Sequence, residues 1–297
     1  MPELLKRGYS RPLILGSLAG AGSFGLLIPP SIGLIIYGVL GEVSIVKLFA
    51  AGFLPGLIVA LFYSIYLGVV SPRLDTESTA IDWHALLGLL PIFFLIFIVL
   101  GSIYCGIASP TEAAAVGVGG ALILAFIEKR LTKQFFVESV FAATQLSCVI
   151  GAVVITASVL STATGIVGIP QTIASWVVGL NLNKAMLLFA LALFYILLGL
   201  FLDGISIVVL TLPLTLPIAV ATGIDPIWFG IFLILMIELG LMTPPVGFNL
   251  FVIQSISKAS IGEIALAAVP FFLIMSASVI LFTIFPQIVL WLPNQLF

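Results

Sequence analysis

Two adjacent prolines interrupt a long apolar run near the C-terminal end of this sequence. Pro244 and Pro245 lie within the stretch from Ile227 to Ile256, which is too apolar for anything but a membrane-embedded segment. Two prolines remove two backbone donors, and their rings clash with the preceding helical turn. We therefore expect the helix to break at bilayer depth, where irregular backbone is tolerated only if protein or a watery cavity covers it. Secondary transporters place substrate and coupling ions at such breaks.

The same arrangement occurs near the start of the chain. Gly25-Leu26-Leu27-Ile28-Pro29-Pro30 matches Gly240-Leu241-Met242-Thr243-Pro244-Pro245 at an offset of 215 residues, and Pro2 falls on Pro217 at that same offset. A constant offset indicates an internal repeat. Paired breaks in two halves of a sequence point to the binding site of a transporter.

The composition defines the surroundings of these breaks. Of 297 residues, 62% are hydrophobic and 7% are charged, whereas soluble domains carry about 25% charged residues. We predict an all-α polytopic membrane protein in a lipid bilayer, with no cleavable signal peptide, because the first apolar run is too long for one. Cys105 and Cys148 are expected to be buried small hydrophobes. The single His84 is placed in a loop, which leaves no imidazole cluster for a metal.

Three regions are predicted along the chain. Residues 1–48 hold the later part of repeat one with the first broken helix, residues 49–135 hold connecting scaffold helices, and residues 136–297 hold repeat two. An apolar segment precedes Pro217 but none precedes Pro2, so we expect the chain to be N-terminally incomplete. The predicted spans are Leu13–Leu40 broken at Ser23–Ser31, Phe49–Val70, Ala85–Tyr104, Ala113–Ile127, Phe141–Gly165, the broken span Ile227–Ile256, and Ile264–Leu290, with a linker at Ser71–His84.

The segment from Ala185 to Ala221 is interrupted at Asp203-Gly204-Ile205-Ser206 and by Pro213 and Pro217. It is either a re-entrant hairpin or two short crossings, and loop charges do not separate these alternatives. We favour the hairpin because each arm has about 14 to 18 residues, which is short for a tilted span. With Met1 inside, eight of the ten Lys and Arg residues become cytoplasmic, and the second broken helix runs opposite to the first. The repeats are therefore predicted to be inverted.

Three carboxylates are candidates for function. Asp203 lies at the hairpin bend, where a membrane-embedded charge is functional by default, although it also suits the N-cap of the returning helix. Glu238 precedes the second break and is either an ion or proton ligand or a structural acceptor for loosened backbone. Glu112 follows Ser109 and Pro110 in the pattern of a helix start.

Neutral oxygens lie at the same interruptions. Ser23, Thr243, Asn249 and Ser206 stand beside carbonyl groups that the breaks would free. Hydroxyl and carbonyl oxygens at unwound helix ends suit a monovalent cation such as Na⁺, and helix N-termini there suit an anionic substrate.

Four motifs in order resemble the large membrane subunit of tripartite ATP-independent periplasmic (TRAP) transporters, over essentially the whole chain. They are Gly22-Ser23-Phe24-Gly25-Leu26-Leu27-Ile28-Pro29-Pro30-Ser31, Ser109-Pro110-Thr111-Glu112-Ala113-Ala114-Ala115, Leu200-Phe201-Leu202-Asp203, and Gly240–Phe251. The resemblance implies an elevator-type fold of the ion-transporter superfamily in the bacterial inner membrane. It also implies Na⁺-driven import of organic acid anions, such as C4-dicarboxylate or sialic acid, with a periplasmic solute-binding protein and a small membrane subunit.

The resemblance further implies the site residues. Gly22, Ser23 and Gly25 would form half of a first Na⁺ site. A second would be framed by Asp203, Gly204, Ser206, Gly240, Thr243 and Gly247. Substrate would lie between the tips, against Pro29, Pro30, Ser31, Thr243, Pro244 and Asn249. The family's Ser-Gly-Thr before the first break is here Ala21-Gly22-Ser23, which removes one hydroxyl. We also expect the chain to lack the family's first hairpin.

Other classes fit the sequence less well. An intramembrane serine protease or metalloprotease needs a nucleophile motif with histidine or a His-Glu-x-x-His motif, and the sequence has neither. An aspartyl protease needs two paired aspartates. Asp203 has no such partner, because Asp225 is predicted to start the next helix. A passive channel or a structural subunit of a membrane complex stays the alternative. No enzymatic activity, no cofactor besides Na⁺ as coupling ion and no nucleic-acid partner are expected.

Overall fold

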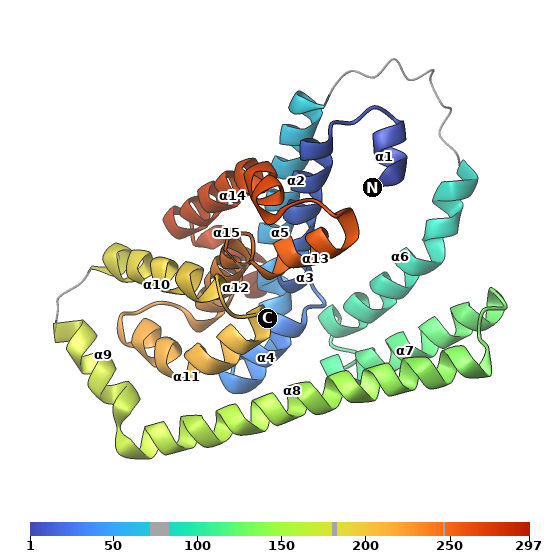
Figure 1. Ribbon diagram of the computed structural model, residues 1–297. Helices are drawn as coiled ribbons and strands as arrows, with labels where there is room; N and C mark the ends of the chain where they lie inside the picture. Colours follow the sequence, from blue (N-terminus) through green and yellow to red (C-terminus); the bar gives the residue numbers. More distant parts are fainter. Residues whose placement is uncertain (72–82, 180–182, 246) are drawn as a thin grey trace. The chain divides into compact units, whose positions relative to one another are not determined.

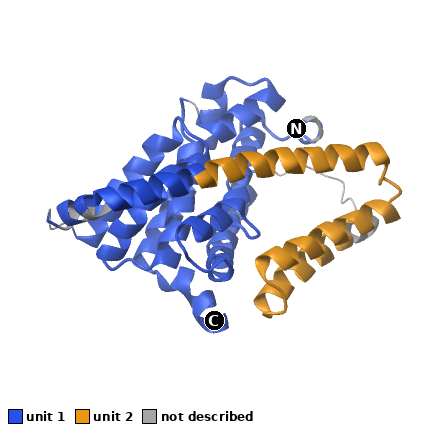
Figure 2. Cartoon of the chain, turned by 90° about the horizontal axis from the view of Figure 1, so that it is seen from below, with its two compact units in different colours: residues 1–74, 156–297 blue, residues 75–155 orange. Residues whose placement is uncertain are grey.

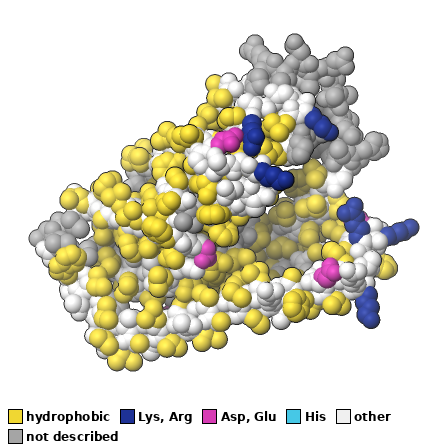
Figure 3. Space-filling model, in the orientation of Figure 1, with side chains coloured by type: hydrophobic (Ala, Val, Ile, Leu, Met, Phe, Trp, Pro, Cys, Tyr) yellow, Lys and Arg dark blue, Asp and Glu magenta, His cyan; other side chains and the backbone are white. Residues whose placement is uncertain are grey.

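The computed structural model describes residues 1–71, 83–179, 183–245 and 247–297, and regular secondary structure in these ranges is α-helical (Figure 1). Within them, six helical stretches are long and apolar enough to cross a membrane. These are Arg11–Leu40, Ile45–Val70, Pro110–Ile127, Lys133–Val167, Gly204–Ala221 and Ile261–Ile284. Hydrophobic side chains cover most of the face in Figure 3. The prediction of an all-α polytopic membrane protein is confirmed.

The chain divides into two compact units (Figure 2). Unit 1 comprises Met1–Leu74 and Thr156–Phe297, and unit 2 comprises Asp75–Ile155, so that helix α8 (Lys133–Val167) belongs to both. Both twin-proline breaks lie in unit 1. The predicted boundaries near residues 48 and 135, the inverted relation of the repeats and the elevator motion stay predictions.

Unit 1 is built around α12 (Pro226–Leu241), in which every residue from Trp228 to Leu241 is buried. A helix that is apolar on all sides is stable only when other helices surround it. The carboxylate of Asp225 starts α12 by accepting hydrogen bonds from the backbone N–H groups of Ile227 (2.8 Å) and Trp228 (3.0 Å). Asp225 therefore begins this helix, as the sequence predicts.

The helices around α12 come from both ends of the chain. It packs against α3, α4, α5, α10, α11, α13, α14 and α15, while α2 pairs with α14. Their bounds are α2 Arg11–Gly22, α3 Phe24–Leu27, α4 Ile32–Leu40, α5 Ile45–Val70, α10 Lys184–Gly199, α11 Gly204–Ala221, α13 Phe248–Ser257, α14 Ile261–Ile284 and α15 Gln287–Leu296. The remaining helices of this unit are α1 (Pro2–Lys6) and α9 (Ile169–Gly179), which packs on α11.

In unit 2, α6 (Trp83–Tyr104) packs against α7 (Pro110–Ile127). Ser109 caps α7, and its backbone N–H donates to the Glu112 carboxylate at 2.8 Å. The Glu112 N–H donates back to the Ser109 hydroxyl at 3.3 Å, which completes a capping box. The prediction that Glu112 is a helix-start residue is confirmed.

Two expectations about where helices are interrupted or end were wrong. α11 continues through Pro213 and Pro217, which stand four residues apart and so deprive only one face of the helix of backbone donors. The last span ends at Ile284 and not at Leu290. Pro286 ends it, because the residue before a proline is driven out of the helical region, and Phe285 has φ −118° and ψ 71°.

Three further expectations differ from the structure. α8 begins at Lys133 and not at Phe141, because the Thr132 hydroxyl caps the N–H of Phe135 at 3.1 Å. Cys105 and Cys148, expected to be buried, are exposed. His84 lies in the first turn of α6 and not in the linker, most of which is outside the described residues.

Candidate functional site

The first break separates α2 from α4. After α2 the chain passes Ser23, forms the single turn α3 and continues through Ile28, Pro29 and Pro30. The Pro29-Pro30 peptide bond is cis. Ser23 is fully buried, and its hydroxyl donates to the Gly20 carbonyl at 2.6 Å. A broken apolar helix is therefore present where the sequence predicts it.

Ser31 closes the first break. Its hydroxyl donates to the carbonyl of Leu26 and accepts from the N–H of Leu34 at 3.4 Å, so that it caps α4. Pro29 and Ser31 are buried, whereas Pro30 and Gly25 are exposed. A methyl group placed on Gly25 would have no neighbour within 4 Å, so there is open space beside this residue.

The second break separates α12 from α13. It contains Pro244-Pro245, which is also cis, and both prolines are exposed. The Thr243 hydroxyl donates to the Leu239 carbonyl at 2.7 Å. Gly247 has φ +44°, and a methyl group there would lie 2.8 Å from the Thr243 carbonyl oxygen and 2.9 Å from that of Leu241. Only glycine fits this position, since both the dihedral and the space exclude a side chain.

The two breaks adjoin each other. A methyl group on Gly22 would lie 3.6 Å from Cγ and Nδ2 of Asn249, which is ordinary contact distance. A pocket of about 300 Å³ lies between α2 and α13 beside these two residues, with walls mainly of apolar side chains such as Leu18 and Val252. Residues far apart in the chain thus form one region of unit 1.

The turn between α10 and α11 reaches the same region. A methyl group on Gly204 would lie 2.7 Å from Cδ1 of Leu26, in the first break, and 3.1 Å from Cγ2 of Ile237, near the end of α12. Asp203 is exposed and caps α11, accepting from the N–H groups of Ile205 (3.1 Å) and Ser206 (3.2 Å). The Ser206 hydroxyl also donates to the Asp203 carboxylate. The capping role foreseen for Asp203 is confirmed.

Gly240 has a packing role that the sequence does not reveal. A methyl group on it would lie 2.7 Å from Cα of Gly199, so that α10 and α12 touch through their backbones. This contact places the end of α10, and hence the Asp203 turn, beside the second break.

Glu238 is the buried carboxylate of the region, with 1% of its surface exposed. It accepts a long hydrogen bond, 3.5 Å, from Nδ2 of Asn249 and one from the backbone N–H of Leu26. Leu26 lies in the single turn α3, where N–H groups lack partners within the helix. The predicted hydrogen bond to loosened backbone is therefore present.

Tyr63 belongs to this region but is not singled out by the sequence. It is buried on α5, its hydroxyl donates to the Phe271 carbonyl at 3.1 Å, and the centre of its ring lies 5.5 Å from that of Phe24 in the first break. No local signal marks it, because it sits inside an uninterrupted apolar helix whose partners come from elsewhere in the chain.

The chemistry of the region suits a small hard cation. The hydroxyls of Ser23 and Thr243 donate their hydrogen to backbone carbonyls, so the lone pairs of their oxygens face away from these bonds and can bind a cation. The amide of Asn249 and the carboxylate of Asp203 provide further oxygen atoms that could bind a cation. Within the described residues no cluster of His, Cys, Asp and Glu has the arrangement of a transition-metal site.

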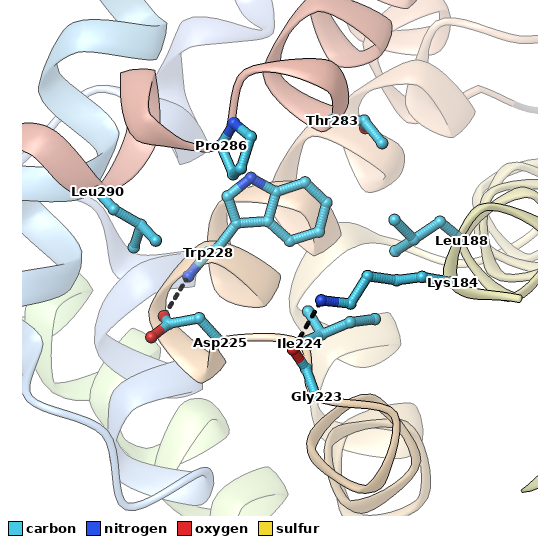
Figure 4. A pocket seen from close by; sticks show the side chains of 9 residues that line it. All are labelled: Lys184, Leu188, Gly223, Ile224, Asp225, Trp228, Thr283, Pro286 and Leu290. Atoms are coloured by element: carbon cyan, nitrogen blue, oxygen red, sulfur yellow. Dashed lines mark hydrogen bonds between the residues drawn. The ribbon is translucent and has the colours of Figure 1, made fainter.

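A second pocket, of about 180 Å³, lies at the opposite ends of α10 and α12 (Figure 4). There the Lys184 ammonium donates to the Gly223 carbonyl at 2.7 Å, and the Trp228 ring N–H donates to the Phe282 carbonyl at 3.1 Å. A helix of this length spans about 24 Å, so this pocket is remote from the breaks. None of the predicted site residues lines it.

Fold and site together define a multi-pass membrane protein whose two broken helices meet inside one unit. The sequence model of the family described as tripartite ATP-independent periplasmic transporter, DctM component, matches residues 1–288. The chain belongs to this family and is a multi-pass protein of the bacterial inner membrane.

Individual relatives of this chain are large permease proteins of TRAP transporters. The C4-dicarboxylate TRAP transporter large permease protein DctM of Pseudomonas aeruginosa is 36% identical over 307 aligned residues, covering 99% of this chain and 70% of that protein. The protein of the same description from Rhodobacter capsulatus is 33% identical, covering 100% and 72%. The ectoine TRAP transporter large permease protein TeaC of Halomonas elongata is 33% identical, covering 100% and 71%. These relatives are transporter permeases.

Proposed function

We propose that this chain imports organic acid anions by Na⁺ symport, together with a periplasmic solute-binding protein and a small membrane subunit. The observation that supports it most is the contact between the two twin-proline breaks, with Gly22 against Asn249. The α10–α11 turn joins them, because Gly204 lies against Leu26 of the first break. Broken helices that meet offer bare carbonyls and helix N-termini to one ion and one substrate. The chain acts as a transporter and not as an enzyme.

The cation ligands of this proposal lie on both breaks and on the turn. The first half-site is Gly22, Ser23 and Gly25, and the second comprises Asp203, Gly204, Ser206, Gly240, Thr243 and Gly247. The substrate would contact Pro29, Pro30, Ser31, Thr243, Pro244 and Asn249. Two observations support this assignment. The hydroxyls of Ser23 and Thr243 keep free lone pairs. Pro30, Pro244 and Pro245 are exposed, so the backbone beside them lacks apolar cover.

The class of substrate needs a separate argument. Two of the relatives carry C4-dicarboxylate in their names and one carries ectoine, a zwitterion. We favour an anion, because the N-termini of α4 and α13 both begin at the breaks, and a helix N-terminus attracts negative charge.

The test is transport of radiolabelled succinate into proteoliposomes that contain the assembled permease, small subunit and binding protein. A Na⁺ gradient should drive accumulation, and replacement of Na⁺ by choline should abolish it. Equal flux in both salts would contradict symport and indicate a passive channel. Unlabelled fumarate should compete with succinate, whereas better competition by ectoine would overturn the choice of an anion.

A further inference from the structure

A groove follows α10 at the end of unit 1 that is remote from the breaks. Its first part is the pocket of Figure 4, which is lined by Lys184, Asp225 and Trp228 among others. A second cavity of about 190 Å³ continues from this pocket, because Leu188 and Thr283 line both. The two cavities form one α10–α14 groove, with a charged end and an apolar end.

The apolar end of the α10–α14 groove has a buried floor and open walls. α10 and α14 both pack against α12, whose Phe232 forms the floor and is 3% exposed. On the walls, Phe189 of α10 and Ile280 of α14 are 67% and 61% exposed. An exposed apolar surface that is hollowed in this way is a binding site for an apolar group.

The dimensions of the groove fit an acyl chain better than a helix. From Lys184 to Ala192 the groove follows α10 for about 12 Å, at 1.5 Å per residue. A helix of that length, about 10 to 12 Å in diameter, occupies on the order of 1,000 Å³. The apolar cavity has about 190 Å³, so a helix would rest on its rim, whereas a single hydrocarbon chain can enter it.

The charged end presents a cation and an anion side by side. The Lys184 ammonium donates one hydrogen to the Gly223 carbonyl at 2.7 Å, and it has two further hydrogens for a ligand. Oδ1 of Asp225 accepts both N–H groups at the start of α12, while Oδ2 makes no hydrogen bond within the described residues. Lys184 and Asp225 line the same pocket, and no ion pair joins them in the described part of the chain. Such an arrangement suits a ligand that carries both charges.

The position of this charged end matches the edge of a membrane. Lys184 and Asp225 stand at the starts of the apolar helices α10 and α12, beside Trp228. Lysine and tryptophan at the ends of apolar helices mark the level of lipid headgroups. The Trp228 ring N–H already donates to the Phe282 carbonyl at 3.1 Å, so the indole meets a ligand through apolar atoms.

We propose that the α10–α14 groove binds a phospholipid with a zwitterionic headgroup, phosphatidylethanolamine. Its phosphate accepts hydrogen bonds from Lys184, its ammonium donates to Asp225, and one acyl chain lies in the apolar end of the groove. The methyl groups of phosphatidylcholine prevent the donation to Asp225, and phosphatidylglycerol brings a net negative charge against this carboxylate. The proposal concerns a lipid site and does not depend on Na⁺ symport.

Native mass spectrometry of the assembled transporter tests the proposal. The detergent-purified complex is mixed with equal amounts of phosphatidylethanolamine, phosphatidylcholine and phosphatidylglycerol that carry the same acyl chains. Phosphatidylethanolamine should bind about tenfold more than either competitor, because hydrogen bonds to charged groups are strong. Equal binding of the three lipids would overturn the proposal.

Two variants test the charged end. Lys184→Gln should lower phosphatidylethanolamine binding about tenfold, because it removes the partner of the phosphate. Asp225→Asn keeps a residue that caps α12 but removes the negative charge, so the preference over phosphatidylglycerol should disappear. Lys47→Gln is the matched control, since Lys47 also stands in the first turn of an apolar helix, α5, but lines neither cavity. Lys184→Gln that binds as much lipid as Lys47→Gln would contradict the assignment of the phosphate.

A third variant tests the apolar end. Ala192→Phe places a ring in the cavity and should reduce phosphatidylethanolamine binding at least as much as Lys184→Gln. The control Ala190→Phe adds the same ring at an exposed position of α10 outside both cavities and should leave binding unchanged. Melting temperatures without lipid show whether each variant is folded. Binding to the isolated chain that disappears in the assembled transporter would show that a polypeptide covers the groove, and would overturn the lipid site.

Discussion

Gly199 and Gly240 meet where α10 packs against α12, and a methyl group on Gly199 would lie only 2.5 Å from Cα of Gly240. This backbone contact ties the arm that carries Asp203 to the helix that ends in the second break. Close approach through small residues is a common means of joining membrane helices. The position of the Asp203 turn therefore depends on two glycines that carry no functional group.

The first prediction is that Gly199→Ala lowers stability by about 1 to 3 kcal/mol, because the added methyl overpacks the contact. Gly68→Ala in α5 is the control, since a methyl group there meets nothing within 4 Å and alanine favours a helix. Thermal unfolding in detergent measures both. A variant Gly199→Ala that unfolds at the same temperature as Gly68→Ala would contradict the close contact.

The second prediction concerns Gly247, at the start of α13. Gly247→Ala should both destabilise the protein and impair uptake, because its φ of +44° and its contacts with the carbonyls of Thr243 and Leu241 leave no room for a methyl group. Gly223→Ala isolates the dihedral contribution, since Gly223 has φ +74° but open space around it. That control should cost about 1 to 2 kcal/mol of stability. It should leave the half-maximal Na⁺ concentration unchanged.

The third prediction concerns Tyr37, whose hydroxyl joins α4 to the first residue of α12 through the Pro226 carbonyl at 2.6 Å. Tyr37→Phe should lower stability by about 1 kcal/mol, the usual loss for one hydrogen bond. Tyr66→Phe is the comparison, because Tyr66 contributes an edge contact between its ring and Phe271, which phenylalanine would keep. Equal melting temperatures for the two variants would show that the Tyr37 hydrogen bond contributes nothing.

Local signals predicted the features that depend on a few neighbouring residues. The two proline breaks, the cap at Asp225 and the Ser109–Glu112 capping box are all decided within one or two helical turns. The same holds for the cap at Asp203. Such features follow from missing donors and available acceptors, which are visible in the sequence itself.

Features that depend on tertiary contacts were missed. Tyr63 and Gly199 acquire their roles from partners on other helices, and no periodicity marks them. Pro213 and Pro217 were expected to interrupt α11, but the intact helix shows that their effect depends on what surrounds them. Cys105 and Cys148 are exposed because apolar surroundings in the sequence do not specify whether lipid or protein covers a side chain.

The last prediction separates the two roles of Asp203. The structure shows that its carboxylate caps α11, and the proposed function adds a cation ligand to that role. Asn is about as good an N-cap as Asp, so Asp203→Asn should keep stability within about 0.5 kcal/mol, whereas Asp203→Ala should lose about 0.5 to 2 kcal/mol. If the charge also binds Na⁺, Asp203→Asn should raise the half-maximal Na⁺ concentration for uptake about tenfold despite its intact cap. Uptake titrations and thermal unfolding of both variants decide the matter, and a normal Na⁺ response in Asp203→Asn would leave Asp203 with a capping role alone.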